Sequence, residues 1–342
     1  MKSILGLDIG SRTIKLVELG KERNTISLVS VGTISTPPKA LTSKIAADSE
    51  AVAVAIKQLL KDANARSRDV NLALPESQVF TRVIEMPQLS SRELTSALQW
   101  EAEQYIPLPL DQVNVDFSVL RDSKETGTNK MDVLLVASPK TLLEKYVNYL
   151  DLAGLNPIGV ETEIISVSRA LASSVSTVRT ALIVSLGAQT TDLAILRGNV
   201  LSFTRSISAG GDALSRALAQ SLGLEAIQAE EFKKTYGLEP DKLEGKIVTA
   251  VKPIMDTIIN EIKRAVAFYV EKYPNDRVEV ILLSGGTARI PGMVVYIAEN
   301  IGSDIEIQLA NPWVGIQRDA RLTQVTTDAA TYCVAVGLAL RV

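Results

Sequence analysis

Leu7-Asp8-Ile9-Gly10-Ser11-Arg12-Thr13-Ile14-Lys15 is the segment from which we predict the fold of this chain. It joins two apolar runs, residues 4–9 and 14–19, across a short polar segment, a pattern that predicts a β-hairpin. Asp8 is unusual, because a carboxylate in a buried strand is costly unless a cation or a hydrogen-bond donor meets it. The N–H groups of a tight turn can bind an anion. The segment therefore predicts either a plain hairpin turn or half of a nucleotide site.

The composition of the 342-residue chain excludes several kinds of protein. With 46% hydrophobic residues it can fill the cores of two domains. A net charge of −3 argues against a nucleic-acid-binding protein, since phosphate contacts need a surplus of Lys and Arg. Cys333 is the only cysteine and the chain has no histidine, so disulfide frameworks, cysteine zinc sites and histidine-dependent catalysis are excluded.

The termini and apolar runs indicate the compartment. The N-terminus has no long apolar core followed by a small-residue cleavage site, as a signal peptide would have. No window reaches the length of a membrane span, and the C-terminus carries no basic amphipathic tail. We expect a soluble cytoplasmic protein that does not itself insert into a membrane.

The pattern after the hairpin predicts an α/β lobe with a second α/β unit inserted in it. A third strand is expected over residues 25–34, a helix around residues 52–63 and a strand over residues 70–74. The elements expected in the inserted unit are strand 79–86, helix 91–105, strands 113–120 and 131–138, helix 140–152 and strand 155–160.

Residues 181–207 repeat the opening pattern of strand, turn, strand and strand. Aligning the two copies on their glycines gives the pairs Gly10 and Gly187, Asp8 and Ser185, Thr13 and Thr190, and Lys15 and Asp192. Internal repetition predicts two similar lobes; a chance similarity between glycine-broken strands is the alternative. A further strand ends at Gly285-Gly286. Two facing turns can clamp a polyphosphate, and bare backbone at this third place can lie against a flat base.

Taken together, these motifs resemble those of the actin-like ATPase superfamily, which includes actin, Hsp70 chaperones and the division protein FtsA, over nearly the whole chain. The resemblance implies an α/β actin-like fold of two ribonuclease H-like lobes, with an inserted α/β subdomain in the first lobe. The implied boundaries are residues 1–78, 161–178 and 322–342 for lobe 1, 79–160 for the inserted subdomain, 179–225 and 277–321 for lobe 2, and 226–276 for a helical subdomain of lobe 2.

The same resemblance implies a site for ATP and Mg²⁺ between the lobes, with Mg²⁺ held through water by Asp8 and Asp192. Glu161 is a candidate for positioning a catalytic water, and an ion pair with a basic residue is its alternative role. Residues 229–234, taken alone, are more typical of a solvated charged helix face. The residues implied in nucleotide binding are Asp8, Gly10, Ser11, Arg12, Thr13, Lys15, Gly187, Gln189, Thr190, Thr191, Asp192, Gly210, Gly211, Glu230, Lys233, Lys234, Gly285, Gly286 and Thr287.

One departure from the superfamily pattern bears on the chemistry. Where the superfamily usually has an acid in the second phosphate motif, this chain has Ser185. Mg²⁺ is held by one or two carboxylates together with substrate phosphates, so the loss of one carboxylate weakens metal-assisted attack. We expect nucleotide binding with at most weak ATP hydrolysis.

Within the superfamily, residues 100–110, Trp-Glu-Ala-Glu-Gln-Tyr-Ile-Pro-Leu-Pro-Leu, are similar to the PilM family of cytoplasmic actin-like proteins in type IV pilus assembly. Trp100 lies off the apolar stripe of its predicted helix, so it is either an exposed interface anchor or packed under a neighbouring strand. The resemblance implies that the cytoplasmic N-terminus of PilN binds in a groove beside the inserted subdomain. The groove candidates are Trp100, Glu101, Tyr105, Ile106 and Pro107.

Three functions remain open from the sequence, together with a structural role in which the lobes keep the fold but, given Ser185, no longer bind nucleotide. The first is an ATP-binding adaptor of the type IV pilus inner-membrane platform, held at the membrane by PilN and coupling nucleotide state to pilus assembly, with other platform proteins and motor ATPases as further partners. The second is an FtsA-like polymerising ATPase, which would self-associate. The third is a small-molecule phosphotransferase, for which the sequence shows no further acid that could act as a base.

Overall fold

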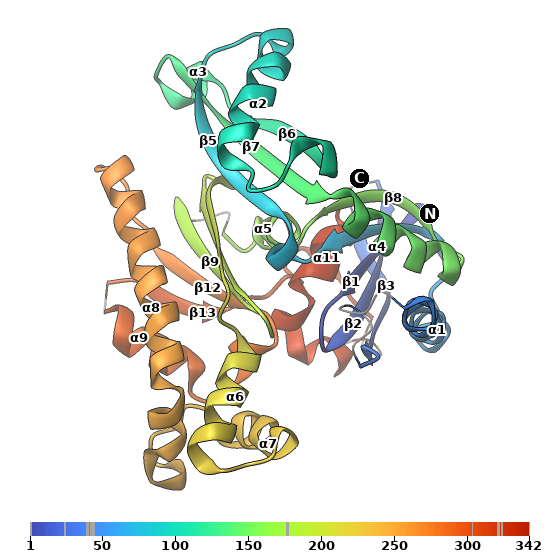
Figure 1. Cartoon of the computed structure of the whole chain (residues 1–342), viewed down its shortest axis with the longest axis vertical. Helices are drawn as coiled ribbons and strands as arrows, with labels where there is room; N and C mark the ends of the chain where they lie inside the picture. The colour runs from blue at the N-terminus through green and yellow to red at the C-terminus, as the bar shows by residue number, and fades with distance from the viewer. Residues whose placement is uncertain are drawn as a thin grey trace.

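The structure, a computed structural model, describes residues 2–23, 25–38, 41, 45–175, 178–302, 304–319, 322 and 324–341. Two mixed sheets form two α/β lobes, and a small antiparallel sheet forms a third unit at the top of the view in Figure 1. Among the described residues, none of the helices combines the length and apolar character needed to cross a bilayer.

Lobe 1 is built on a six-stranded sheet with the opening hairpin at its centre. The strand order is β14 (Ile316–Gln317), β3 (Thr25–Ser35), β2 (Thr13–Glu22), β1 (Lys2–Ile9), β4 (Asp69–Leu74) and β8 (Asn156–Thr162). One face of the sheet is covered by α1 (Ala46–Asp62) and α4 (Lys140–Ala153), which pack on Leu5 and Leu7. The other face is covered by α5 (Glu163–Leu171) and α11 (Cys333–Ala339). At Gly6 a Cβ atom would overlap the Ala335 carbonyl, so glycine lets α11 lie directly on β1.

Lobe 2 repeats the strand arrangement of lobe 1. Its strand order is β11 (Val200–Ile207), β10 (Thr191–Arg197), β9 (Thr180–Leu186), β12 (Val280–Ser284) and β13 (Glu306–Leu309). In each lobe a hairpin and a third antiparallel strand precede two parallel strands, which confirms the repeat predicted from the glycines. The outer face packs against α6 (Gly211–Leu222), α7 (Ala226–Tyr236), α8 (Lys246–Lys272) and α9 (Met293–Ile301). The inner face packs against α5, which therefore lies between the two sheets.

The inserted subdomain is smaller than the sequence predicted. It contains β5 (Phe80–Pro87), α2 (Ser91–Tyr105), β6 (Val113–Arg121), α3 (Ser123–Thr126) and β7 (Lys130–Pro139). The predicted limit at residue 160 is wrong, because α4 packs on α1 and β8 joins the lobe 1 sheet. The predicted extent of lobe 2 is also too long, since β14 pairs with β3 of lobe 1. From here on, "inserted subdomain" means residues 80–139.

The inserted subdomain is attached to lobe 1 by the chain but to lobe 2 by its contacts. Arg121 Nη2 lies 2.9 Å from Asp132 Oδ2, and both side chains are buried. Lys272 at the end of α8 approaches Asp132 Oδ1 at 3.5 Å, and Arg121 donates to the Tyr273 hydroxyl at 3.2 Å. Thr204 of β11 donates to the Thr81 carbonyl at 3.0 Å. The buried ion pair between Arg121 and Asp132 of the inserted subdomain therefore also contacts two residues of lobe 2, Lys272 and Tyr273.

Short 3₁₀ helices complete the connections between these elements. They are η1 (Glu76–Gln78), η2 (Leu110–Gln112), η3 (Lys242–Gly245), η4 (Thr287–Arg289) and η5 (Gln324–Tyr332). Of these, η1, η4 and η5 lie at the junction of the two lobes, where the candidate site is formed.

Candidate functional site

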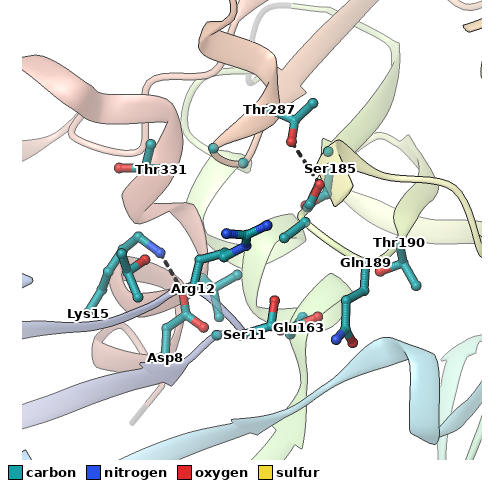
Figure 2. A pocket seen from close by; sticks show the side chains of 18 of the residues that line it. Asp8, Ser11, Arg12, Lys15, Glu163, Ser185, Gln189, Thr190, Thr287 and Thr331 are labelled. Atoms are coloured by element: carbon teal, nitrogen blue, oxygen red, sulfur yellow. Dashed lines mark hydrogen bonds and ion pairs between the residues drawn. The ribbon is translucent and has the colours of Figure 1, made fainter. Parts of the chain in front are cut away.

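A cavity of about 580 Å³ lies between the two lobes. It is lined by the β1–β2 turn of lobe 1, the β9–β10 turn of lobe 2, the first turns of α5 and α6, part of α7, and η4 and η5. Figure 2 shows side chains from both lobes pointing into this space. The three glycine-containing strand ends that were predicted to converge do so here.

The two turns have the same backbone geometry. Gly10 N–H donates to the Thr13 carbonyl at 3.1 Å, and Gly187 N–H donates to the Thr190 carbonyl at 2.9 Å. Within the described residues, the N–H groups between these partners, at positions 11 and 12 and at positions 188 and 189, have no acceptor. Successive free N–H groups in a tight turn form a concave anion-binding surface. Each lobe therefore offers such a surface to the cavity.

The acidic side chains of the two lobes stand on different strands. In lobe 1, Asp8 on β1 is opposite Lys15 on β2. In lobe 2, Ser185 on β9 is opposite Asp192 on β10. Directly opposite residues project from the same face of a sheet, about 5 Å apart. The carboxylate missing at position 185 is thus supplied by the neighbouring strand, at the place where lobe 1 has its lysine.

Both acids are buried and hydrogen-bonded. Lys15 Nζ lies 3.3 Å from Asp8 Oδ2. Asp192 accepts hydrogen bonds from the hydroxyls of Ser206 at 2.5 Å and Thr190 at 3.0 Å. Burial outweighs these donors and raises the pKa of Asp192 to about 6. Asp192 consequently changes charge near pH 6.

Two further acids lie beside the cavity that the sequence prediction missed. Glu163, the first residue of α5, lines the cavity, and Glu76 of η1 lies behind it. The two carboxyls are linked by backbone: Glu76 N–H donates to Glu163 at 3.2 Å, and Ile164 N–H donates to Glu76 at 3.3 Å. Burial raises the pKa of both, to about 8 for Glu76, and the charge of Asp192 adds to each shift.

Glu161 lies away from the cavity, so its predicted role in positioning a water is not supported by its place. Its carboxylate is held by Arg169 at 2.5 Å and 2.8 Å, by Ser166 at 2.6 Å and by Arg341 at 3.5 Å. The alternative role, an ion pair with a basic residue, is the one observed. The chain turns from β8 into α5 between Glu161 and Glu163, which directs the second acid into the cavity.

The third strand end lies against the second turn. Gly285 has φ +88°, and a Cβ atom there would overlap the Leu186 backbone, so both conformation and space require glycine. Thr287 Oγ1 donates to the Gly187 carbonyl at 2.8 Å. Gly286 has open space around it. A flat ligand can therefore approach the backbone at this position.

Lys233 and Glu230 of α7 support the wall of the cavity. Lys233 is buried and donates to the Gly211 carbonyl and the Ser215 hydroxyl of α6, both at 2.8 Å. It also lies 2.7 Å from Glu230. Burial acts to raise the pKa of Glu230, but the hydrogen bonds from Lys233 and Ser215 outweigh it and lower that pKa to about 2. Lys233 therefore links α7 to α6 by hydrogen bonds and also lines the cavity.

Arg12 crosses the cavity from lobe 1 to lobe 2. Its Nη2 lies 2.6 Å from Asp212 in the first turn of α6 and 3.9 Å from Glu230. In Figure 2 its side chain occupies the middle of the cavity. The Arg12 side chain is 54% exposed, so the pair contributes little to stability, on the order of 0–1 kcal/mol. Its position makes it a direct link between the lobes.

We therefore expect Arg12→Ala to widen the cleft without unfolding the protein. The change removes an interlobe ion pair and leaves both sheets intact, so the radius of gyration from small-angle X-ray scattering should increase while the free energy of unfolding changes by less than about 1 kcal/mol. Lys252→Ala is the matched control, because it removes an exposed pair with Asp256 inside one helix. An unchanged radius in the Arg12 variant would contradict this link.

A family model described as type IV pilus assembly protein PilM matches residues 6–342. The chain belongs to the PilM family. The structure is similar to the solved PilM-PilN type IV pilus biogenesis complex, with 30% identity, coverage of 99% of this chain and 98% of that chain, and a TM-score of 0.86.

More distant relatives of this PilM-family chain show the same fold. Cell division protein FtsA of Streptococcus pneumoniae is 24% identical over 92% of this chain and 77% of that protein. EutJ of Carboxydothermus hydrogenoformans is 16% identical with a TM-score of 0.59, covering 99% of this chain and 90% of that one. MreB5 of Spiroplasma citri bound to AMPPNP is 14% identical with a TM-score of 0.50, covering 98% and 95%. The predicted actin-like fold is confirmed.

Most of the predicted nucleotide-binding residues of this PilM-family chain line the cavity. Thr191 and Gly210 do not. Thr191 donates to the Ala209 carbonyl at 2.7 Å, and Gly210 lets α6 approach the second turn, since a Cβ atom there would lie 2.8 Å from the Ala188 carbonyl oxygen. The predicted residues that line it are Asp8, Gly10, Ser11, Arg12, Thr13, Lys15, Gly187, Gln189, Thr190, Asp192, Gly211, Glu230, Lys233, Lys234, Gly285, Gly286 and Thr287.

The predicted partner groove of the PilM-family chain is described in part. Trp100 and Glu101 lie in α2, but their side chains are outside the described residues. Tyr105 is half-buried, with the Arg82 guanidinium 4.9 Å from its ring centre. Ile106 is buried in the core of the inserted subdomain, which leaves Pro107, an exposed residue, on the surface. Ile106 therefore anchors this loop and has no free face for a partner.

Proposed function

We propose that this chain binds ATP with Mg²⁺ between its lobes and acts as a cytoplasmic adaptor of the type IV pilus inner-membrane platform by binding the N-terminal segment of PilN. The observation that carries the nucleotide part is the pair of equivalent turns facing one cavity of about 580 Å³. A cavity of roughly 300–1,000 Å³ is typical of small-molecule sites. Two anion-binding turns on opposite walls suit a chain of phosphates.

The residues present fit a hydrated divalent cation. The acidic groups at one end of the cavity are those of Asp8, Asp192 and Glu163. Lys15 of lobe 1 pairs with Asp8 there and is the nearby positive charge. Within the described ranges, no three acidic side chains converge closely enough to ligate an ion directly. Mg²⁺ commonly keeps several bound waters, so Asp8 and Asp192 would hold the ion through those waters. The ion would supply positive charge at the acidic end of the cavity.

Slow turnover is expected from the state of Glu163. Burial is the main cause that raises the pKa of Glu163 above its usual value, and it would persist with Mg²⁺ bound. The charges of Asp8 and Asp192 raise this pKa further in the metal-free protein. A protonated carboxyl accepts no proton from an attacking water. In this arrangement the cleft binds nucleotide better than it activates water, and ATP serves mainly to favour one position of the lobes.

The adaptor part is supported by the similarity to the PilM-PilN complex over 99% of this chain. Our candidate binding surface for the PilN segment lies on the inserted subdomain near Pro107 and Leu108. The Leu108 residue is 44% exposed. Binding there would place the protein at the inner membrane through its partner. Because this subdomain contacts lobe 2 through Arg121 and Tyr273, movement of the lobes would reach the peptide site.

Isothermal titration calorimetry tests both parts. With Mg²⁺ present, the wild type should bind ATP, and Asp8→Asn should weaken binding by about tenfold or more, because it removes a charge from the metal end of the site. Asp111→Asn, an exposed acid of the inserted subdomain, is the control. Absence of ATP binding by the wild type would refute the nucleotide part. Equal ATP affinity with and without the PilN N-terminal peptide would show that the two sites are uncoupled.

A further inference from the structure

A second depression, of about 530 Å³, lies on lobe 1. It is formed by the C-terminal half of α1, the loop from α1 to β4 and the end of α4. The Ser67 hydroxyl of that loop donates to the Ser3 carbonyl at 2.9 Å, at the start of β1. From Ser3 to Asp8 the strand extends about 17 Å. The depression is therefore at the opposite end of β1 from the cleft and is a separate feature.

Four cationic side chains line this depression. Lys57 and Lys61 are one turn apart on α1, and Arg66 and Arg68 follow on the loop. All four are exposed, and in the part of the chain that the structure describes none of them forms an ion pair. Its lining contains no acidic residue. In a chain with a net charge of −3, this is a local excess of positive charge without an internal partner.

The acids nearest in sequence are engaged elsewhere. Asp62 accepts a hydrogen bond from Gln58 at 2.6 Å, and Asp69 accepts one from Asn156 at 2.9 Å. Glu18 is fully buried beneath the loop. None of the three lines the depression, so the four cations remain available to a ligand from outside.

The buried Glu18 carboxylate fixes the loop that carries the arginines. It accepts hydrogen bonds from the backbone N–H groups of Arg66 at 3.0 Å and Ser67 at 3.1 Å, and from the hydroxyls of Ser3 at 2.7 Å and Ser30 at 3.2 Å. Arg68 Nη1 donates to the Ser67 carbonyl at 3.1 Å. A loop held in this way loses little further freedom when a ligand binds.

We propose that this basic depression binds a small multivalent anion that carries phosphate groups, either free in solution or as the headgroup of an anionic lipid. Arg and Lys bind phosphate through strong charge-assisted hydrogen bonds. The four cations surround one compact hollow, so they suit a ligand that concentrates several charges in a small volume. An acidic peptide would spread its charges along an extended chain, at about 3.3 Å per residue.

Lysine acetylation in the presence of a ligand, followed by mass spectrometry, locates the binding. Sodium tripolyphosphate is the soluble probe, and phosphatidylcholine vesicles with or without cardiolipin, whose headgroup carries two phosphates, are the lipid probe. We expect Lys57 and Lys61 to be protected by about fivefold or more, while Lys263, an exposed lysine of α8, is unchanged. Protection by tripolyphosphate identifies a soluble ligand, and protection only by vesicles with cardiolipin identifies a lipid headgroup. Protection by neither probe would overturn the proposal.

Calorimetry with a double variant provides the second measurement. Lys57→Ala/Lys61→Ala should lower the affinity of this site for the protecting probe about tenfold or more, since two charge-assisted contacts are lost. Arg216→Ala/Lys263→Ala removes the same charge from exposed positions of lobe 2 and should bind as the wild type does. The cleft is intact in both variants, so the difference between them reports on the depression alone. Equal affinities in the two double variants would refute the proposal that the basic depression binds the anion.

Discussion

Gly337→Ala is expected to destabilise the protein by about 3 kcal/mol or more. Gly337 lies in α11 where that helix crosses α5, and a Cβ atom there would overlap the carbonyl carbon and oxygen of Ser166. These are backbone atoms of a buried helix, so neither can turn aside as a flexible side chain does. The two helices would have to separate, and α5 would lose contact with both sheets at once.

The sign of this effect separates packing from helix propensity. Within a helix, alanine is favoured over glycine by about 1 kcal/mol, so propensity alone would make the variant more stable. Urea denaturation followed by circular dichroism measures the difference. Gly286→Ala is the control, because its φ of −66° suits alanine and its surroundings are open. A Gly337 variant as stable as the wild type would show that the helices are not in close contact here.

The second large effect is a loss of stability as the pH rises from about 4.5 to 8. Glu76 has an ordinary pKa of 4.5 in the unfolded chain, but burial and the charge of Asp192 raise it to about 8 in the folded protein. Between these values the folded state holds a proton that the unfolded state has lost. The stability that Glu76 contributes is therefore complete at the acidic end and is lost as the pH rises, by up to about 1.4 kcal/mol per pH unit.

Glu76→Gln should make this profile less steep and make the protein more stable at pH 8 than the wild type. Part of the slope should remain, because burial also raises the pKa values of Glu163 and Asp192. The glutamine oxygen can still accept the Ile164 N–H, and no charge forms beside Asp192 and Glu163. The free energy of unfolding at a series of pH values from 5 to 8.5 is the measurement. Glu271→Gln, an exposed acid of α8, should follow the wild type. Parallel profiles for the wild type and the Glu76 variant would show that the Glu76 carboxyl is not protonated in the folded protein.

The repeat in the sequence was sufficient to predict both lobes and the two facing turns, whereas the rest of the cavity lining was implied by the resemblance to the actin-like ATPase superfamily. A glycine at a strand end, with a hydroxyl residue three positions later, describes a turn whose hydrogen bond needs only local geometry, and Gly10 and Gly187 each form it. Local patterns of this kind survive in a single sequence. They fixed the two turns and the strands on either side without knowledge of the rest of the chain.

Features that depend on distant contacts were not predictable in the same way. Residues 140–160 have the pattern of a helix and a strand in either unit, and only the packing of α4 on α1 and the pairing of β8 with β4 assign them to lobe 1. Glu76 gives no local signal, because its role arises from Glu163 and Asp192, which are far away in the chain. The sequence alone could not show which acid, Glu161 or Glu163, faces the cavity, because that depends on where α5 begins.

The arrangement of Asp8 and Asp192 has a consequence for how a ligand sits in the cleft. A clamp with two identical halves would accept a phosphate chain in either direction. Here the ladder position that holds Lys15 in lobe 1 holds Asp192 in lobe 2, so the two walls differ in charge at matching points. The two walls of the cleft are therefore not equivalent, and we expect a phosphate chain to bind there in one orientation.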